Sequence, residues 1–454
     1  MSDIASRHME NPEMPGNSPV DLTAQQQSKS TFFKKISTIG AGGKQYFDQV
    51  DEVKLSTIQH ELEVGNDKEK LVAMKRLLAM ISKGRDVAAA FPNVVKCVIN
   101  KNAEVRKLVY MFLVHYAEVQ PQEALLAINS LQKAMTENNQ HMRANALRCM
   151  SNIRVKEIAQ LIVLAVQKAA KDMSPYVRKA AAFAIPKIMR LDARHLEQCT
   201  ELISTLLADN STMVVGAAAQ AFMEVCPDRF DIIHPVFRHM CNLLPDVDEW
   251  GQVSIVNLLL RYGRTQFVNP DPLVQKAIRE KHAAEHPNEA PKEKTDDEIF
   301  ESAEDDDLVP TLDPDHRLML QNTLCLMQSR NSAVVLATAV LHFYMAPPAE
   351  VGRIAKPMVR LLHADRETEY VALANIATMA ATYPRLFSDV VDEFFVAGCE
   401  SLPTRTLKLD ILTRSANEQN IGRILKELKE YSRDENKEFV AAAVQAIGRC
   451  ATAL

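Results

Sequence analysis

The chain has few of the features that mark nucleic-acid-binding, membrane or secreted proteins. Aromatic residues make up 6% of its 454 residues, and 53 basic residues against 58 acidic ones give a net charge of −5. The basic excess typical of a nucleic-acid-binding protein is therefore missing. No run approaches the roughly 18 apolar residues of a membrane-spanning helix, and the first residues lack the apolar core of a signal peptide. We expect a cytoplasmic protein that does not bind nucleic acid.

Motifs for catalysis and metal binding are missing as well. The eight cysteines contain no CxxC pair, and most lie in apolar stretches, which is typical of reduced core cysteines. There is no GxxxxGK[ST] phosphate loop, no HExxH and no GxSxG. Twelve histidines are scattered without the spacing of metal ligands. The sequence predicts a protein that is not an enzyme and has no cofactor, catalytic residue or metal site.

What the sequence does contain is a repeat of about 36 residues. Each copy begins with a polar residue, mostly Asp or Asn, and reaches an apolar position five residues later, before an Ala-rich apolar stretch. In the first four copies these apolar positions are spaced 37, 35 and 37 residues apart. Over the whole chain they are Val105, Met142, Val177, Val214, Trp250, Val334, Tyr370 and Phe439. This period predicts an all-α fold, a HEAT- or armadillo-like right-handed α-solenoid of stacked helix pairs.

One interruption divides the repeats. The 84 residues from Trp250 to Val334 exceed one period by 48, which matches the stretch 265–312 and its acidic centre EAPKEKTDDEIFESAEDDD. We therefore predict a disordered tail over 1–35, solenoid over 36–264, an acidic disordered insertion over 265–312, and solenoid again over 313–454. Because the last apolar helix has no polar cap, we expect a chain truncated within a longer solenoid.

The repeat also assigns roles to its polar residues. The leading Asp or Asn is expected to be the N-cap of a helix, where its side-chain oxygen accepts a backbone amide. Apolar residues at the key position and at four and seven residues later form one buried stripe, as at Val177, Ala181 and Ala184. The arginine after the key position (Arg106, Arg143 and Arg178) is expected to pair with an Asp of a neighbouring repeat rather than to bind a partner.

Several blocks resemble a known family. The segments GRDVAAAFPNVVKCV, RKLVYMFLVHYAEVQP, MRANALRCMSNIRV and SPYVRKAAAFAIPK, in this order from Gly84 to Lys187, resemble the N-terminal trunk of beta-adaptins, the large subunits of vesicle-coat adaptor complexes. The acidic insertion followed by LDPDHRLMLQNT, together with SRNSAVVLATAVLHFY, VRLLHADRETEYVALANIATM and AIGRCA, is most similar to the beta subunits of adaptor-protein complex 3.

This resemblance implies a function and partners. It implies a non-enzymatic scaffold that assembles with delta, mu and sigma adaptor subunits. The complex would sort cargo from Golgi and endosomal membranes toward lysosomes, as a peripheral coat. It also implies that hinge and ear domains are absent here. In the family, the helix after the Gln-Pro turn contacts the GTP form of an Arf GTPase. Here the matching residues are Leu125 and Ile128, which could equally be repeat core, because an apolar i, i+3 pair occurs on any amphipathic helix.

Two further possibilities stay open. Thr295 and Ser302 each precede a carboxylate by three residues, as an acid-directed kinase requires, although a solvated spacer has the same composition. An all-α repeat array with an acidic loop would also suit a nuclear transport receptor or a phosphatase scaffold. Binding to the GTPase Ran or to a phosphatase catalytic subunit would distinguish these.

Overall fold

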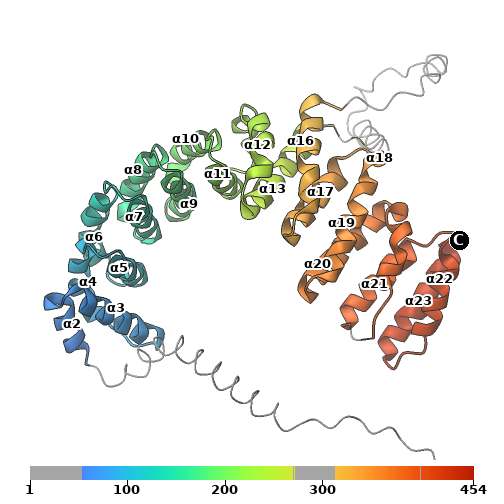
Figure 1. Ribbon diagram of the computed structural model, residues 1–454, viewed down its shortest axis with the longest axis horizontal. Helices are drawn as coiled ribbons and strands as arrows, with labels where there is room; N and C mark the ends of the chain where they lie inside the picture. Colours follow the sequence, from blue (N-terminus) through green and yellow to red (C-terminus); the bar gives the residue numbers. More distant parts are fainter. Residues whose placement is uncertain (1–53, 269, 271–311, 399, 454) are drawn as a thin grey trace, which may run out of the picture. The chain divides into compact units, whose positions relative to one another are not determined.

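The computed structural model describes residues 54–268, 270, 312–398 and 400–453, and all regular elements in these ranges are helical (Figure 1). The described chain divides into two compact units, one containing residues up to Glu137 together with 152–155, and the other containing Asn138–Ser151 and the residues from Lys156 onward. The predicted all-α class is confirmed. The predicted tail over 1–35 and nearly all of the predicted insertion, including Thr295 and Ser302, lie outside the described residues; Thr265 and Gln266 are helical.

The first unit stacks its helices in two rows. Helices α2 and α4 pack together, α4 packs against α6, and α3 packs against α5. The elements of this unit are α2 (Leu55–Val64), α3 (Asp67–Ser82), η2 (Ala88–Ala90), α4 (Phe91–Lys96), η3 (Cys97–Ile99), α5 (Ala103–Tyr116) and α6 (Pro121–Ala134).

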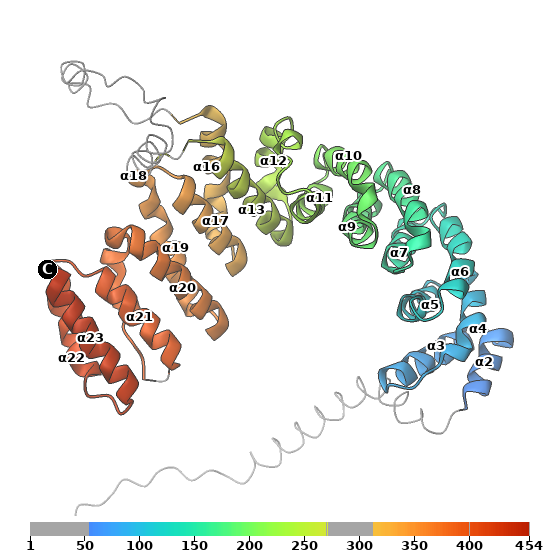
Figure 2. The ribbon, with the colours of Figure 1, turned by 180° about the vertical axis from the view of Figure 1, so that it is seen from behind.

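The second unit continues the same arrangement over most of the chain. Its first half contains α7 (Gln140–Asn152), η4 (Lys156–Ile158), α8 (Ala159–Ala170), α9 (Pro175–Leu191), η5 (Ala193–His195), α10 (Leu196–Leu207), α11 (Thr212–Val225), η6 (Phe230–Ile232), α12 (Phe237–Leu243), η7 (Leu244–Asp246) and α13 (Glu249–Gln266). Seen from behind, α8, α10 and α12 form one row, and α7, α9, α11 and α13 form the other (Figure 2). The helices of the second row pack side by side, α9 on α11 and α11 on α13.

The stacking resumes after residue 312. Helix α17 packs directly against α13, and α16 packs against α12, so the repeat is continued on the far side of the predicted insertion. The elements here are α16 (Pro314–Leu324), η8 (Cys325–Gln328), α17 (Ser332–Met345), α18 (Pro348–Val351), η9 (Gly352–Ile354), α19 (Ala355–Arg360), η10 (Leu361–His363), α20 (Arg366–Thr382), η11 (Pro384–Phe394), α21 (Leu402–Arg414), α22 (Ile421–Tyr431) and α23 (Lys437–Ala453).

The core consists of the predicted apolar stripes. Val177 and Ala181 are buried, as are Val214 and Ala218, each with at most 1% of its surface exposed. Alanine in this stripe keeps the helix propensity high and lets neighbouring helices approach closely. The apolar positions predicted from the repeat are therefore confirmed for these copies.

Two of the predicted key positions are wrong. Trp250 is 77% exposed and Tyr370 is 47% exposed. In α13 the core position falls on Gly251, because α11 and α13 touch through their backbones there: a Cβ on Gly216 would lie 2.7 Å from the Gly251 Cα. In α20 the helix begins earlier relative to the acid, since Asp365 is itself the N-cap, so residue 370 turns to the exposed face.

Asp365 is the N-cap of α20, as predicted, but the prediction is corrected for α9 and α11. Ser174 and Ser211 are the N-caps of α9 and α11, whereas Asp172 and Asp209 stand two residues earlier. Each Asp accepts a hydrogen bond of 2.8 Å from the backbone amide of its serine. Because a short acidic side chain can bond the amide two residues ahead, the Asp shapes the turn before the helix. Its carboxylate can still accept hydrogen bonds from a second donor.

Candidate functional site: a partner-binding surface

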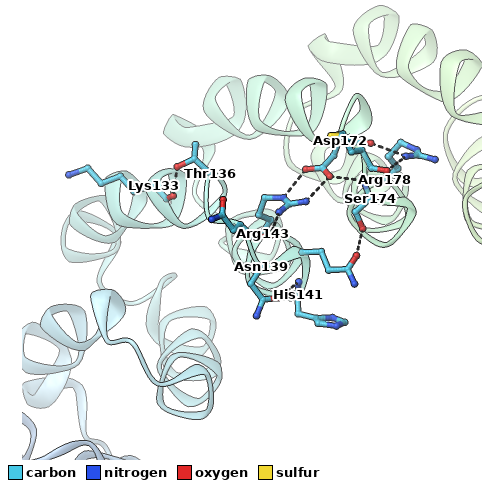
Figure 3. Close-up of polar contacts among 11 residues, drawn as sticks. Lys133, Thr136, Asn139, His141, Arg143, Asp172, Ser174 and Arg178 are labelled. Atoms are coloured by element: carbon cyan, nitrogen blue, oxygen red, sulfur yellow. Dashed lines mark hydrogen bonds and ion pairs between the residues drawn. The ribbon is translucent and has the colours of Figure 1, made fainter.

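The arginines of the repeat join successive helix pairs. Arg143 on α7 donates two hydrogen bonds of 2.9 Å to the Asp172 carboxylate (Figure 3). Arg178 on α9 contacts both carboxylate oxygens of Asp209 in the same way. Arg106 pairs likewise with Glu137 in the first unit. The predicted pairing with the next repeat is thus confirmed, with Glu in place of Asp at 137. The three guanidinium groups thus bind carboxylates of the same chain.

The electrostatics of these pairs follow from their half-buried position. Burial alone would raise the pKa of the Asp172 carboxyl, but the hydrogen bonds from Arg143 and from the Ser174 amide outweigh it and lower that pKa below its usual value. Each arginine is also fixed by backbone carbonyls, since Arg143 donates to Asn138 O and Arg178 to Asp172 O, both at 2.8 Å. The pairs set the spacing of the repeats, which the chain needs in order to present any surface.

The two residues predicted to contact a GTPase are both on α6, but only one of them is exposed. Ile128 is only 3% exposed and belongs to the core stripe with Ala124 and Leu131, whereas Leu125 is 40% exposed. The sequence reasoning missed Leu126, which is 69% exposed. Because 124, 127, 128 and 131 follow the helical core spacing, that spacing alone could have assigned Ile128 to the core. We call Leu125 and Leu126 the α6 apolar surface.

Among the described residues, no group of three or more His, Cys, Asp or Glu side chains could hold a metal ion. The inward histidines are satisfied: His316 Nε2 lies 2.8 Å from Met345 O, and His342 Nε2 lies 3.0 Å from Thr323 Oγ1. Burial lowers the pKa of His342 to about 4 and raises the pKa of Cys149 to about 12, so both stay neutral near pH 7. The described surface is suited to binding.

No helix of the described ranges is both long and apolar enough to span a membrane. An exposed apolar pair on α6, charge pairs between repeats and stacked helices within each unit are typical of a scaffold whose surfaces bind other molecules.

Comparison with known proteins supports this class. The adaptin N terminal region family matches residues 49–454, so the chain belongs to the adaptin family.

Within that family the chain is similar to particular subunits. It is 47% identical over 424 residues to "AP-3 complex subunit beta" of Dictyostelium discoideum, covering 90% of this chain and 38% of that protein. It is 45% identical over 416 residues to "AP-3 complex subunit beta-1" of Homo sapiens, covering 92% of this chain and 37% of that protein. The predicted resemblance is confirmed, and the chain spans less than two fifths of the length of these relatives.

A structural comparison agrees. A homology model of the full-length AP-3 complex in an intermediate open conformation contains a chain that matches with a TM-score of 0.61 and 26% identity, covering 95% of this chain and 71% of that one. Together with the all-helical stack, this similarity confirms the α-solenoid.

Proposed function

We propose that this chain is the trunk scaffold of the beta subunit of an AP-3-type adaptor complex. The observation that carries the proposal is the identity of 45 to 47% to AP-3 beta subunits; the AP-3 beta subunit of Schizosaccharomyces pombe is more distant, at 31%. By comparison, "AP-1 complex subunit beta-1" of Mus musculus is 30% identical over 422 residues, 89% of this chain and 40% of that protein. In this role the chain is not an enzyme. It holds partner subunits in place on large, distributed surfaces.

The proposed partners are the delta, mu and sigma subunits. The proposed site of action is a peripheral coat on Golgi and endosomal membranes, from which cargo leaves for lysosomes and related organelles. Phosphorylation of Thr295 and Ser302 stays part of this proposal. The adaptin family membership leaves a nuclear transport receptor and a phosphatase scaffold without support.

The test is affinity purification of the 454-residue chain from cells, followed by mass spectrometry. Recovery of delta, mu and sigma subunits of the third adaptor complex is the expected result. Recovery of clathrin-adaptor subunits instead would contradict the AP-3 assignment while keeping the family. A folded chain that recovers no adaptor subunit would contradict assembly through this trunk region.

We further propose that the α6 apolar surface contacts the GTP form of an Arf GTPase. Leu126→Glu places a charge on a surface position that is 69% exposed, so folding is expected to change by less than about 0.5 kcal/mol. Binding to GTP-loaded Arf is expected to weaken about tenfold, a loss of about 1.4 kcal/mol. Leu164→Glu on α8, where the side chain is 52% exposed, is the matched control and should bind as the parent does. Equal weakening in both variants would rule out a specific contact at α6.

A further inference from the structure

Helices α7 and α9 contain several basic residues and no Asp or Glu. Together they contribute six Lys and Arg side chains, and four of these reach carboxylates on other elements. Arg143 and Arg178 form the inter-repeat pairs, Lys179 lies 3.6 Å from Asp248, and Arg190 pairs with Glu224. Within the described parts of the chain, the remaining two, Arg148 and Lys187, form no ion pair with a carboxylate.

Arg148 is held in place by neutral groups. Its Nη1 donates to the Tyr176 hydroxyl at 2.8 Å and to Asn145 Oδ1 at 3.2 Å, and the guanidinium lies 4.9 Å from the centroid of the Tyr176 ring. The His141 ring packs edge-on against the same tyrosine at 4.9 Å. These contacts fix the orientation of the guanidinium without neutralising its charge. A fixed, planar set of N–H donors is a good receptor for a carboxylate, because it loses little entropy on binding.

Lys187 adds a second positive charge that the fold leaves uncompensated. Its side chain is half-buried on α9, and burial together with the nearby charges of Arg148 and Arg190 lowers the pKa of its ammonium group. Holding like charges close together costs free energy, which an opposite charge from outside the chain would recover. A strained charge arrangement of this kind is typical of binding sites.

An exposed aromatic side chain lies on the same helix face. Phe183 is 36% exposed and precedes Lys187 by four residues and follows Tyr176 by seven, a spacing that places the three along one side of α9. The opposite side of the helix, with Ala181 and Ile185, is buried, and Ala180, which lies on the same side between Tyr176 and Phe183, is buried as well. We call Arg148, Tyr176, Phe183 and Lys187 the α7–α9 cationic surface.

We propose that the α7–α9 cationic surface binds an acidic peptide segment of a partner protein, with carboxylates at Arg148 and Lys187 and an apolar side chain against Phe183. Charge complementarity supports this occupant, because two cations without carboxylates flank an apolar group. This site is distinct from the α6 apolar surface, so its failure would leave the function proposed above intact.

The experiment measures binding of a short fluorescein-labelled peptide, rich in Glu around a central Leu, to the 454-residue chain by fluorescence anisotropy. A second peptide carries Gln at every Glu position. The double variant Arg148→Gln with Lys187→Gln is expected to weaken binding of the Glu peptide at least about tenfold, as two charge-assisted contacts are lost. The Gln peptide should bind the parent chain about as weakly as the Glu peptide binds the double variant.

The matched control removes two positive charges from the neighbouring α8 region. Lys168 and Lys171 are exposed there and form no ion pair among the described residues, so Lys168→Gln with Lys171→Gln should change the affinity less than about twofold. Circular dichroism of each variant verifies folding. If the control pair weakens peptide binding equally, the effect comes from net charge alone, and the proposal is overturned. Equal binding of the Glu and Gln peptides would also overturn it. A parallel measurement uses phosphatidylserine vesicles, and binding to these vesicles but not to the Glu peptide would indicate a membrane contact instead.

Discussion

Two stretches of the second unit join their helices in different ways. In α7 and α9, the fourth residue of the helix is an arginine that pairs with the acid of the next repeat, Arg143 with Asp172 and Arg178 with Asp209. From α11 to α17 the equivalent residues are Val215, Gln252 and Val335, and no such pair exists between these described helices. The first stretch is spaced by charge pairs, and the second is held by close apolar contact.

The two interfaces differ in their residues. The acid that pairs with Arg178 precedes α11, whereas Gly216 and Gly251 bring the backbones of α11 and α13 into van der Waals contact. Gln252 donates instead to the carbonyls of Leu244 and Pro245, within its own repeat. Farther on the pairing returns in both senses: Glu369 of α20 lies 3.2 Å from Lys408 of α21, and Arg405, the fourth residue of α21, pairs with Asp434 at 3.1 Å. The comparison shows that one repeat pattern supports two kinds of interface.

The largest expected effect comes from separating the close pair of helices. Gly216→Val would place side-chain atoms against the Gly251 backbone, which cannot move without shifting α13. We expect a loss of about 3 kcal/mol in the free energy of unfolding, measured by urea denaturation. Gly422→Ala is the control, since a Cβ added there would meet no neighbouring side chain or helix within 4 Å, and it should be neutral or stabilise by up to about 1 kcal/mol. A tolerated Gly216→Val would contradict the close-contact interface.

The next largest effect is expected on the free energy of unfolding at acidic pH, through His342 in the stretch from α11 to α17. Burial lowers the pKa of His342 on α17 to about 4, so below pH 6.5 the unfolded state takes up a proton that the folded state excludes. Stability should therefore fall by roughly 2 kcal/mol between pH 7 and pH 5, measured by urea denaturation across this range. His342→Gln should flatten this dependence, and the exposed His363→Gln should not. The Asp172 pair has the opposite origin: its lowered carboxyl pKa stabilises the fold at neutral pH and is lost only as the pH falls through that value.

A smaller effect is expected from breaking one charge pair. In Arg178→Ala the Asp209 carboxylate, whose side chain is 11% exposed, loses its ionic partner. We expect the free energy of unfolding to fall by about 1.5 kcal/mol. A double-mutant cycle of Arg178 and Asp209 measures the coupling energy of the pair, and 1 M salt should lower this energy only if water reaches the pair. The control is Arg229→Ala, which breaks the exposed pair with Asp231 and should change stability by less than about 0.5 kcal/mol. Equal effects of the two substitutions would show that the inter-repeat pairs have no special role.

Much of this arrangement was predictable from local patterns. The spacing of Val177 and Val214 predicted their burial, and the arginine after three of the key residues predicted the charge pairs, because periodicity and charge are properties of neighbouring residues. The errors have two sources. Trp250 and Tyr370 were placed by sequence spacing alone, but their exposure depends on where each helix begins and on which helix packs against it. Ile128 was placed by the family resemblance, although its spacing also fits the core, and Leu126 is not one of the two positions that the resemblance matched.

The sequence by itself determined the all-α class, the repeat length and the resemblance to beta-adaptins, because these depend on order and spacing along the chain. Only the tertiary structure decided which apolar residues remain exposed on α6, and that Arg148 and Lys187 lack a carboxylate partner among the described residues. Pairing between residues on different helices depends on the distance between those helices. Packing of whole side chains and backbones sets that distance.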